Sequence, residues 1–269
     1  MGIRVLAVFF AACTTILAQF DAQEIVRRSV ENADRSWQAR LNYLYTKRTE
    51  EKRLDGQGRV KSDDVDVVNH LVINGGPVEV AVSHNGGPAT AAQQRKNKEA
   101  LEKQRQETPA GRADRQREER ESHAFINEVP QAFDFRMIGT DEINGRPAFV
   151  ISATPKPGYQ AHTKYAKILA AVRGKLWVDQ QDFGWVKADV AVTEPFSMGY
   201  FLARVQPGSR ILLEQTRVGG GLWMPVKVAV EADAKVFFLI NYKMNETITY
   251  ADYRPAEGAG LASSATGVR

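Results

Sequence analysis

The second half of this chain is a succession of runs in which apolar and polar residues alternate, and no other feature constrains the fold as strongly. Alternation with a period of two is typical of strands that bury one face. Glycine-containing turns such as QPGS (206–209) and VGGG (218–221) separate the runs, and connections this short favour antiparallel neighbours. We therefore predict four consecutive strands, whose approximate ranges are 199–205, 210–218, 222–237 and 241–255.

The first half combines helical and strand patterns. Apolar residues within 25–33 have the spacing of an amphipathic helix, and Asp21 is placed to cap it. Two alternating runs then flank DGQG (55–58), which is a hairpin signal. Further strands are predicted at 77–90 and on both sides of INGR (143–146). The sequence therefore predicts an α+β protein built on an antiparallel sheet.

The stretch GKLWVDQQDFGWVKAD (174–189) raises the question whether its two central aspartates form a carboxylate site. Both flanking runs alternate, and the alternation places Trp185, Lys187 and Asp189 together on the face opposite Val186. Aspartate side chains accept hydrogen bonds from the backbone of a turn, and Gly184 can adopt φ values that other residues avoid. We therefore predict a hairpin turn. A calcium or magnesium site would need several more oxygen ligands, and no ladder of Asp or Asn follows.

The N-terminus has the organisation of a secretory signal peptide. Arg4 precedes the apolar run VLAVFFAACTTILA, and cleavage is expected after Ala18 or Ala22. A buried N-terminal helix is the alternative. The run is short for a membrane span, and no later stretch is long enough, so we expect no span in the mature chain. Cys13, the only cysteine, lies in a poor lipobox. We expect a periplasmic protein with signal peptide 1–22, and outer-membrane anchoring through a lipidated Cys13 as the less favoured outcome.

Two further helical regions are predicted. Residues 90–122 are nearly all Ala, Gln and charged residues, with many opposite charges three or four apart. We interpret them as exposed helices, with a disordered linker or a basic nucleic-acid or membrane arm as alternatives. Acids and bases nearly balance, and the net charge of the chain is only +4, so nucleic acid is not an expected partner. A short amphipathic helix is predicted at 165–172, with Gly174 as its stop.

Known catalytic and metal-binding motifs are missing from the sequence. The four histidines lack zinc-motif spacing, and His70, in a predicted strand, is interpreted as a structural residue. Ser83 adjoins His84, but there is no GxSxG elbow. The glycine clusters follow strands without opening helices, which argues against phosphate binding. We therefore predict a protein that is not an enzyme and has no metal or cofactor.

Several stretches together resemble one known family. They are the strand end ISATPKPG, the segment KILAAVRG, the hairpin GKLWVDQQDFGWVKADV, the run GSRILLEQTRVGGGLWMPVKVAVEADAKVF and the closing ETITYADYR. Their order, after an export signal and a helix, resembles the periplasmic lipoprotein-carrier family (LolA/LolB-like) and its relatives among sigma-factor regulatory proteins. The likeness covers about residues 22–255. It implies a curved, incomplete β-barrel, half open, with helices packed on its concave side.

The resemblance also implies a domain organisation. Residues 23–255 would form a single half-barrel domain, with 90–122 as a charged helical insertion and 256–269 as a disordered tail. The insertion is longer than the carriers' plug helices and lacks an apolar face. The carriers have an arginine on the concave face, and Arg136 and Arg204, both on predicted strands, are the candidates for it.

Large apolar side chains concentrate in the C-terminal half. Most must be core, but a half-open barrel has room for an apolar cleft, and we predict that some line it: Trp177, Trp185, Phe196, Met198, Tyr200, Phe201 and Trp223. The first hypothesis is an exported binding protein that holds a lipid, an acyl chain or a lipoprotein anchor in this cleft. The alternative is a structural or regulatory module that binds envelope proteins.

Overall fold

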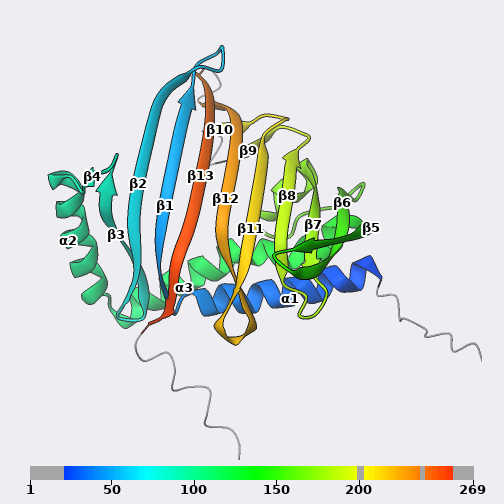
Figure 1. The fold of residues 1–269 in the computed structure, drawn as a ribbon, viewed down its shortest axis with the longest axis horizontal. Coiled ribbons are helices and arrows are strands. Elements are labelled where there is room, and N and C mark those ends of the chain that lie inside the picture. Colours follow the sequence, from blue (N-terminus) through cyan, green and yellow to red (C-terminus); the bar gives the residue numbers. More distant parts are fainter. Residues whose placement is uncertain (1–20, 199–202, 237–239, 257–269) are drawn as a thin grey trace, which may run out of the picture.

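The computed structural model describes residues 21–198, 203–236 and 240–256, and its main feature is one large antiparallel sheet (Figure 1). Eleven strands follow the order β4-β3-β2-β1-β13-β12-β11-β8-β7-β6-β5, and β10 joins β9 to β12. The strands are β1 (Tyr43–Leu54), β2 (Val60–Ile73), β3 (Gly76–His84), β4 (Gly87–Pro88), β5 (Phe133–Ile143), β6 (Arg146–Pro155), β7 (Val172–Asp179), β8 (Trp185–Val192), β9 (Phe196–Met198), β10 (Ala203–Val205), β11 (Arg210–Val218), β12 (Leu222–Val236) and β13 (Ile240–Pro255). Because β4 and β5 do not pair with each other, the sheet is open, which confirms the predicted α+β half-open barrel.

Four α-helices accompany the sheet within the described residues: α1 (Ala22–Arg40), α2 (Ala91–Arg105), α3 (Pro109–His123) and α4 (Val129–Ala132). Three 3₁₀ turns complete the elements: η1 (Ala124–Glu128), η2 (Ala166–Ala171) and η3 (Gly219–Gly221). In Figure 1, α1 and α3 run across the lower ends of the strands, while α2 lies beside the β3–β4 edge. The upper parts of β2, β1, β13 and β12 extend beyond these helices.

Three Asn-Gly turns connect neighbouring strands of the sheet. Asn74, Asn85 and Asn144 have φ values of 49°, 49° and 53°, and each is followed by glycine. These dihedrals belong to the left-handed region, which Asn and Gly tolerate best. The turns therefore join β2 to β3, β3 to β4, and β5 to β6 as hairpins, as their sequences predict.

The first and last strands, β1 and β13, pair with each other in the middle of the sheet. β1 pairs with β13 along its length, so that Thr49 lies opposite Ile248. β13 also pairs with β12, where Ile248 lies opposite Val228. Such long-range pairing joins the strands that precede α2 to those that follow η2. It makes one continuous surface of segments that are far apart in sequence.

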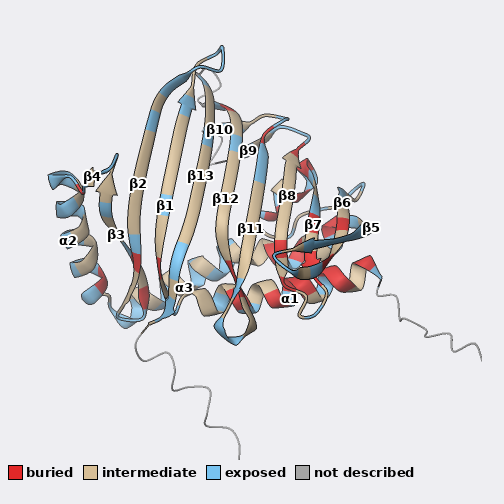
Figure 2. Ribbon diagram, viewed as in Figure 1, coloured by how far each residue is buried: buried red, intermediate tan, exposed pale blue. Residues whose placement is uncertain are grey.

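The buried core lies towards the β5–β8 side of the sheet, around α1 (Figure 2). Ile25 and Val26 of α1 are fully buried and pack with Ile151, Leu176 and Val178. Burying a side chain of this size stabilises the fold by about 1.5–3 kcal/mol. Asp21 occupies the N-cap position of α1 as predicted, although its side chain makes no capping bond. The face of the sheet on which α1 packs is here called the helix-bearing face.

Two local predictions are wrong. The helix expected at 165–172 is only a 3₁₀ turn, because Val172 already pairs with Val192 in the sheet. Gly174 does not stop a helix but lies within β7, where a Cβ would come 2.6 Å from the backbone oxygen of Asp189. Its lack of a side chain lets β7 and β8 approach closely.

Other predictions fall where the structure gives no description. The signal segment up to residue 20, with Cys13, lies outside the described residues, and so does the tail beyond residue 256. Of the strand predicted at 199–205, only Ala203–Val205 is described.

Candidate functional site

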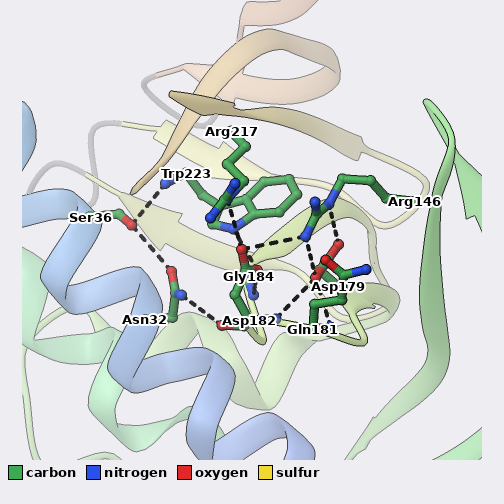
Figure 3. Close-up of polar contacts among 9 residues, drawn as sticks. All are labelled: Asn32, Ser36, Arg146, Asp179, Gln181, Asp182, Gly184, Arg217 and Trp223. Atoms are coloured by element: carbon green, nitrogen blue, oxygen red, sulfur yellow. Dashed lines mark hydrogen bonds and ion pairs between the residues drawn. The ribbon is translucent and has the colours of Figure 1, made fainter. Parts of the chain in front are cut away.

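The aspartates of the 174–189 hairpin form a structural clamp (Figure 3). Asp179, at the end of β7, is fully buried and accepts two hydrogen bonds from Arg146, at 2.6 and 2.8 Å. Its Oδ1 also accepts the backbone N–H groups of Gln181 (2.9 Å) and Asp182 (3.1 Å). Burial alone would raise the pKa of Asp179, but the bonds from Arg146 and the turn backbone hold that pKa below its usual value. The carboxylate is satisfied as an anion within the fold.

Asp182 connects the same turn to the β11–β12 hairpin. Its Oδ1 accepts the indole N–H of Trp223 at 2.9 Å, and its Oδ2 lies 3.0 Å from Nε of Arg217 (Figure 3). Its carbonyl oxygen accepts a bond from the side-chain amide of Asn32 at 2.9 Å, which joins the turn to α1. The turn of the hairpin therefore connects α1 to the ends of β6, β11 and β12. The predicted turn is confirmed, and both carboxylates serve packing.

The residues around the turn correct two details of the prediction. The left-handed conformation belongs to Phe183, with φ of 59°, and not to Gly184. Gly184 is instead required by packing, because a Cβ there would lie 1.9 Å from Nε1 of Trp223. A bulge between β7 and β8 places Trp185 opposite Val178 on the helix-bearing face, where it donates to Ser29 at 2.7 Å, whereas Lys187 lies opposite Trp177 on the other face.

A second buried carboxylate, Glu128, holds the loop before η2. It accepts the backbone N–H groups of His162 (2.9 Å) and Thr163 (2.7 Å) and the hydroxyl of Tyr159 (2.5 Å). Burial opposes its ionisation, but these donors lower its pKa to about 2. Glu128 is therefore a loop anchor and not a proton-transfer group.

The structure separates Trp185 from Trp177 and Trp223, which pack in one cluster, although the sequence analysis assigned all three to one cleft. Trp177 lies on the face opposite the helices, where its indole donates to Asp141 at 3.1 Å. Trp185 packs in the core around α1. Trp223 is only 3% exposed and packs with Val186 and Ala148. No single surface contains these three rings.

The remaining predicted site residues are also dispersed. Phe196 packs against the core cluster that contains Val192. Arg136 in β5 and Arg204 in β10 are exposed and lie on strands that do not pair with each other. The side chain of Met198 is not described, and Tyr200 and Phe201 lie outside the described residues.

A different set of apolar side chains does share one surface. Leu213 of β11 lies opposite Ala188, which packs against the core around α1. On its other side Leu213 lies opposite Val228, and Val228 lies opposite Ile248. Directly paired residues of antiparallel strands project to the same face. This row is therefore on the helix-bearing face, across β11, β12 and β13.

A second row runs beside the first. Ile211 lies opposite Val230, and one step further along β12 Ala232 lies opposite Met244. None of these aliphatic residues is buried, and Ile211 is 37% exposed. We call the following six residues the aliphatic strip: Ile211, Leu213, Val228, Val230, Met244 and Ile248. Figure 2 shows that the long strands carrying it are mostly half-buried.

A polar side chain interrupts the strip on β13. Glu246 lies between Met244 and Ile248 on the same face, opposite Val230 on one side and opposite Glu51 on the other. Glu51 is held by Arg53 (2.6 Å) and by the hydroxyl of Tyr242 (3.2 Å). Burial, with Glu51 alongside, raises the pKa of Glu246. The surface thus changes from aliphatic on β11 and β12 to charged on β1.

A cleft of about 570 Å³ lies between α1 and α3. The rings of Trp37 and His123 stack there at 4.1 Å, and Nε2 of His123 lies 3.3 Å from Asp34. Burial lowers the pKa of His123, and Asp34 opposes this effect. Most of the lining is polar or charged, so this cleft does not suit an acyl chain.

Among the described residues, no group of three or more His, Cys, Asp or Glu side chains is placed to hold a metal ion. None of the described helices is both long and apolar enough to cross a membrane. The aliphatic strip is the candidate site because its side chains share one half-buried face across three strands.

Among known proteins, the matches to this chain are solved structures. No family model and no curated protein matches the chain. Solved structures similar to it include a DUF1329 family protein from Desulfovibrio piger, with 10% identity, a TM-score of 0.35, and coverage of 89% of this chain and 95% of that chain. A putative outer membrane lipoprotein-sorting protein domain from Vibrio parahaemolyticus has 13% identity, a TM-score of 0.36, and coverage of 87% and 94%.

A member of the family that the sequence resembles is also among the solved structures. A LolA superfamily protein from Nitrosomonas europaea has 12% identity, a TM-score of 0.33, and coverage of 88% of this chain and 94% of that chain.

Proposed function

We propose that this protein is an exported, non-enzymatic binding protein that holds a lipid, an acyl chain or a lipoprotein anchor against the aliphatic strip. The observation that carries the proposal is the half-exposed strip itself, shared by β11, β12 and β13 on the helix-bearing face. Aliphatic side chains grouped on one accessible surface mark an interaction site. The expected location is the periplasm, to which the N-terminal signal pattern would direct the chain.

The physical basis of binding is burial of methylene groups. Each methylene removed from water contributes about 0.8 kcal/mol. Neighbouring strands are about 4.8 Å apart, so the strip is about 10 Å across. A surface of this kind holds a flexible chain without specific hydrogen bonds. Transfer then requires only a partner that offers a similarly apolar surface.

A matched pair of variants in β12 tests the proposal. Val228 faces the strip, whereas its neighbour Ala229 lies opposite Leu212 on the other face, and both are half-buried. We expect Val228→Asp to weaken binding of a fluorescent fatty acid to the delipidated protein at least about tenfold, because a carboxylate would have to be desolvated. We expect Ala229→Asp to leave binding unchanged. Equal binding by both folded variants would refute the site.

The second candidate function is an interaction module for envelope proteins, and one observation favours it. Strand β5 is an edge of the sheet, and Ile138 on it is 47% exposed. A free edge strand can accept a partner strand. However, a bulge at Gly139 and the exposed charges Asp134, Arg136 and Asp141 disfavour strand addition. We therefore rank this function second.

A further inference from the structure

Helix α2 carries most of the chain's excess positive charge. Its sequence AAQQRKNKEALEKQR contains five basic and two acidic residues, a net charge of +3, whereas the whole chain has +4. The neighbouring helix α3 has the same length, with four basic and four acidic residues. All five basic residues of α2 are exposed: Arg95, Lys96, Lys98, Lys103 and Arg105.

The charges of the two helices also differ in their pairing. In α3, Arg115 pairs with Glu107 (2.8 Å) and Glu119 (3.1 Å), and Arg117 pairs with Asp114 (2.9 Å). In α2, the only basic residue in an ion pair within the described part of the chain is Arg105, which lies 3.8 Å from Glu102. Four cations of α2 therefore remain without a carboxylate partner there.

The inward side of α2 fixes the direction in which these cations project. Asn97 forms two hydrogen bonds with the backbone of Ala81 in β3, both at 2.9 Å. Gln93 donates to Asp66 of β2 at 3.2 Å, and Gln104 is buried. The amide side chains thus hold α2 against the β3 edge. The basic residues occupy the remaining, solvent-facing side of the helix.

We propose that the solvent-facing side of α2 docks on a membrane surface through the phosphates of anionic phospholipids. This inference rests on the proposed function, since an acyl ligand is taken from a membrane or delivered to one. Lysine and arginine near an anionic surface each strengthen binding several-fold. No large apolar side chain of α2 is exposed, so the contact is electrostatic and involves no insertion. The Asn97 anchor holds the charged side of α2 towards that surface.

Vesicle flotation of the full mature chain tests this inference. One variant combines Arg95→Gln, Lys96→Gln, Lys98→Gln and Lys103→Gln. A control removes the same charge from the face of the sheet opposite the helices: Lys175→Gln, Lys187→Gln, Lys227→Gln and Lys235→Gln. The vesicles contain either equal parts of phosphatidylglycerol and phosphatidylcholine or phosphatidylcholine alone.

We expect the wild type and the control to bind phosphatidylglycerol vesicles and to lose binding at high salt. The α2 variant should bind them at least about tenfold more weakly. Equal binding by the α2 variant and the wild type, a larger loss in the control, or no preference of the wild type for phosphatidylglycerol would overturn the inference.

The Val228→Asp variant separates this inference from the proposed function. It should still float with phosphatidylglycerol vesicles, because α2 is unchanged, while it fails to retain a fatty acid. If the wild type floats with these vesicles but retains no fatty acid, the proposed function fails and the docking surface remains. If fatty acid is retained without flotation, the docking inference alone fails.

Discussion

At the scale of the residue, His70 shows how a side chain with chemical potential serves packing. It is 8% exposed in β2 and stacks on Tyr45 with ring centroids 4.2 Å apart. Neither of its ring nitrogens has a hydrogen-bond partner among the described residues. Burial lowers the pKa of His70 to about 4, with Glu79 opposing this effect. The histidine is therefore neutral at neutral pH, as expected of a structural residue.

This burial predicts acid sensitivity. The unfolded chain takes up a proton at His70 near pH 6.5 and the folded chain near pH 4, so protonation favours unfolding as the pH falls between these values. At pH 5 the loss is about 2 kcal/mol relative to neutral pH. His70→Phe keeps the stack on Tyr45 and should lack this loss. Urea unfolding of both proteins at pH 7.5 and pH 5 measures it, and an identical pH dependence would contradict the account.

The buried clamp of the 174–189 hairpin predicts a large effect for a conservative change. Asp179→Asn removes the charge that faces Arg146, which is 26% exposed. We expect a loss of about 2–3 kcal/mol, or about 4–10 °C in Tm. The control is Asp189→Asn, which affects a similar pair with the more exposed Arg210 and should cost less than about 1 kcal/mol. Equal melting shifts of the two variants would show that burial does not determine the effect.

Single residues also show where local pattern fails. The turn at 179–184 was predictable because aspartate and glycine have strong turn chemistry. The face of Trp185 was not, because one extra residue in a β-bulge reverses the alternation beyond it. The role of Gly184 depends on Trp223, which lies far away in sequence. No local window contains that contact.

At the scale of the element, α2 protects the edge of the sheet. The side-chain amide of Asn97 occupies both backbone groups of Ala81 as a neighbouring strand would. We expect Asn97→Ala to destabilise this edge by about 1 kcal/mol and to speed amide hydrogen exchange in β3. Lys98→Ala, an exposed change in the same helix, is the control. If exchange in β3 is unchanged by Asn97→Ala, α2 does not protect the edge.

Elements were predictable where their signals are local. The strands after η2 and the helices between residues 91 and 123 follow from alternation, turn residues and charge spacing. The segment 165–172 has helical spacing, but it is too short to form a stable α-helix, because its last residue is already paired in β7. Helix α2 packs on the sheet through amide side chains and has no apolar face. Its packing side therefore could not be predicted from the sequence.

At the scale of the whole molecule, strand order determines where the candidate site lies. The strip exists because β11, β12 and β13 are neighbours and because Leu213, Val228 and Ile248 share one register row. Alternation in each strand is visible in the sequence, but pairing between strands is not. The sequence therefore favoured large aromatic rings, of which Trp185 and Trp223 serve packing. The aliphatic strip is instead made of ordinary aliphatic residues.

The central claim is that the mature protein carries an acyl ligand, and native mass spectrometry of protein purified from the periplasm without detergent tests it most directly. We expect an added mass that organic extraction removes and that is recovered as lipid. We expect this mass to be missing from Val228→Asp and present in Ala229→Asp. A wild-type protein that has only its polypeptide mass, and keeps it after incubation with phospholipid and acylated peptide, would contradict the claim and favour a protein partner.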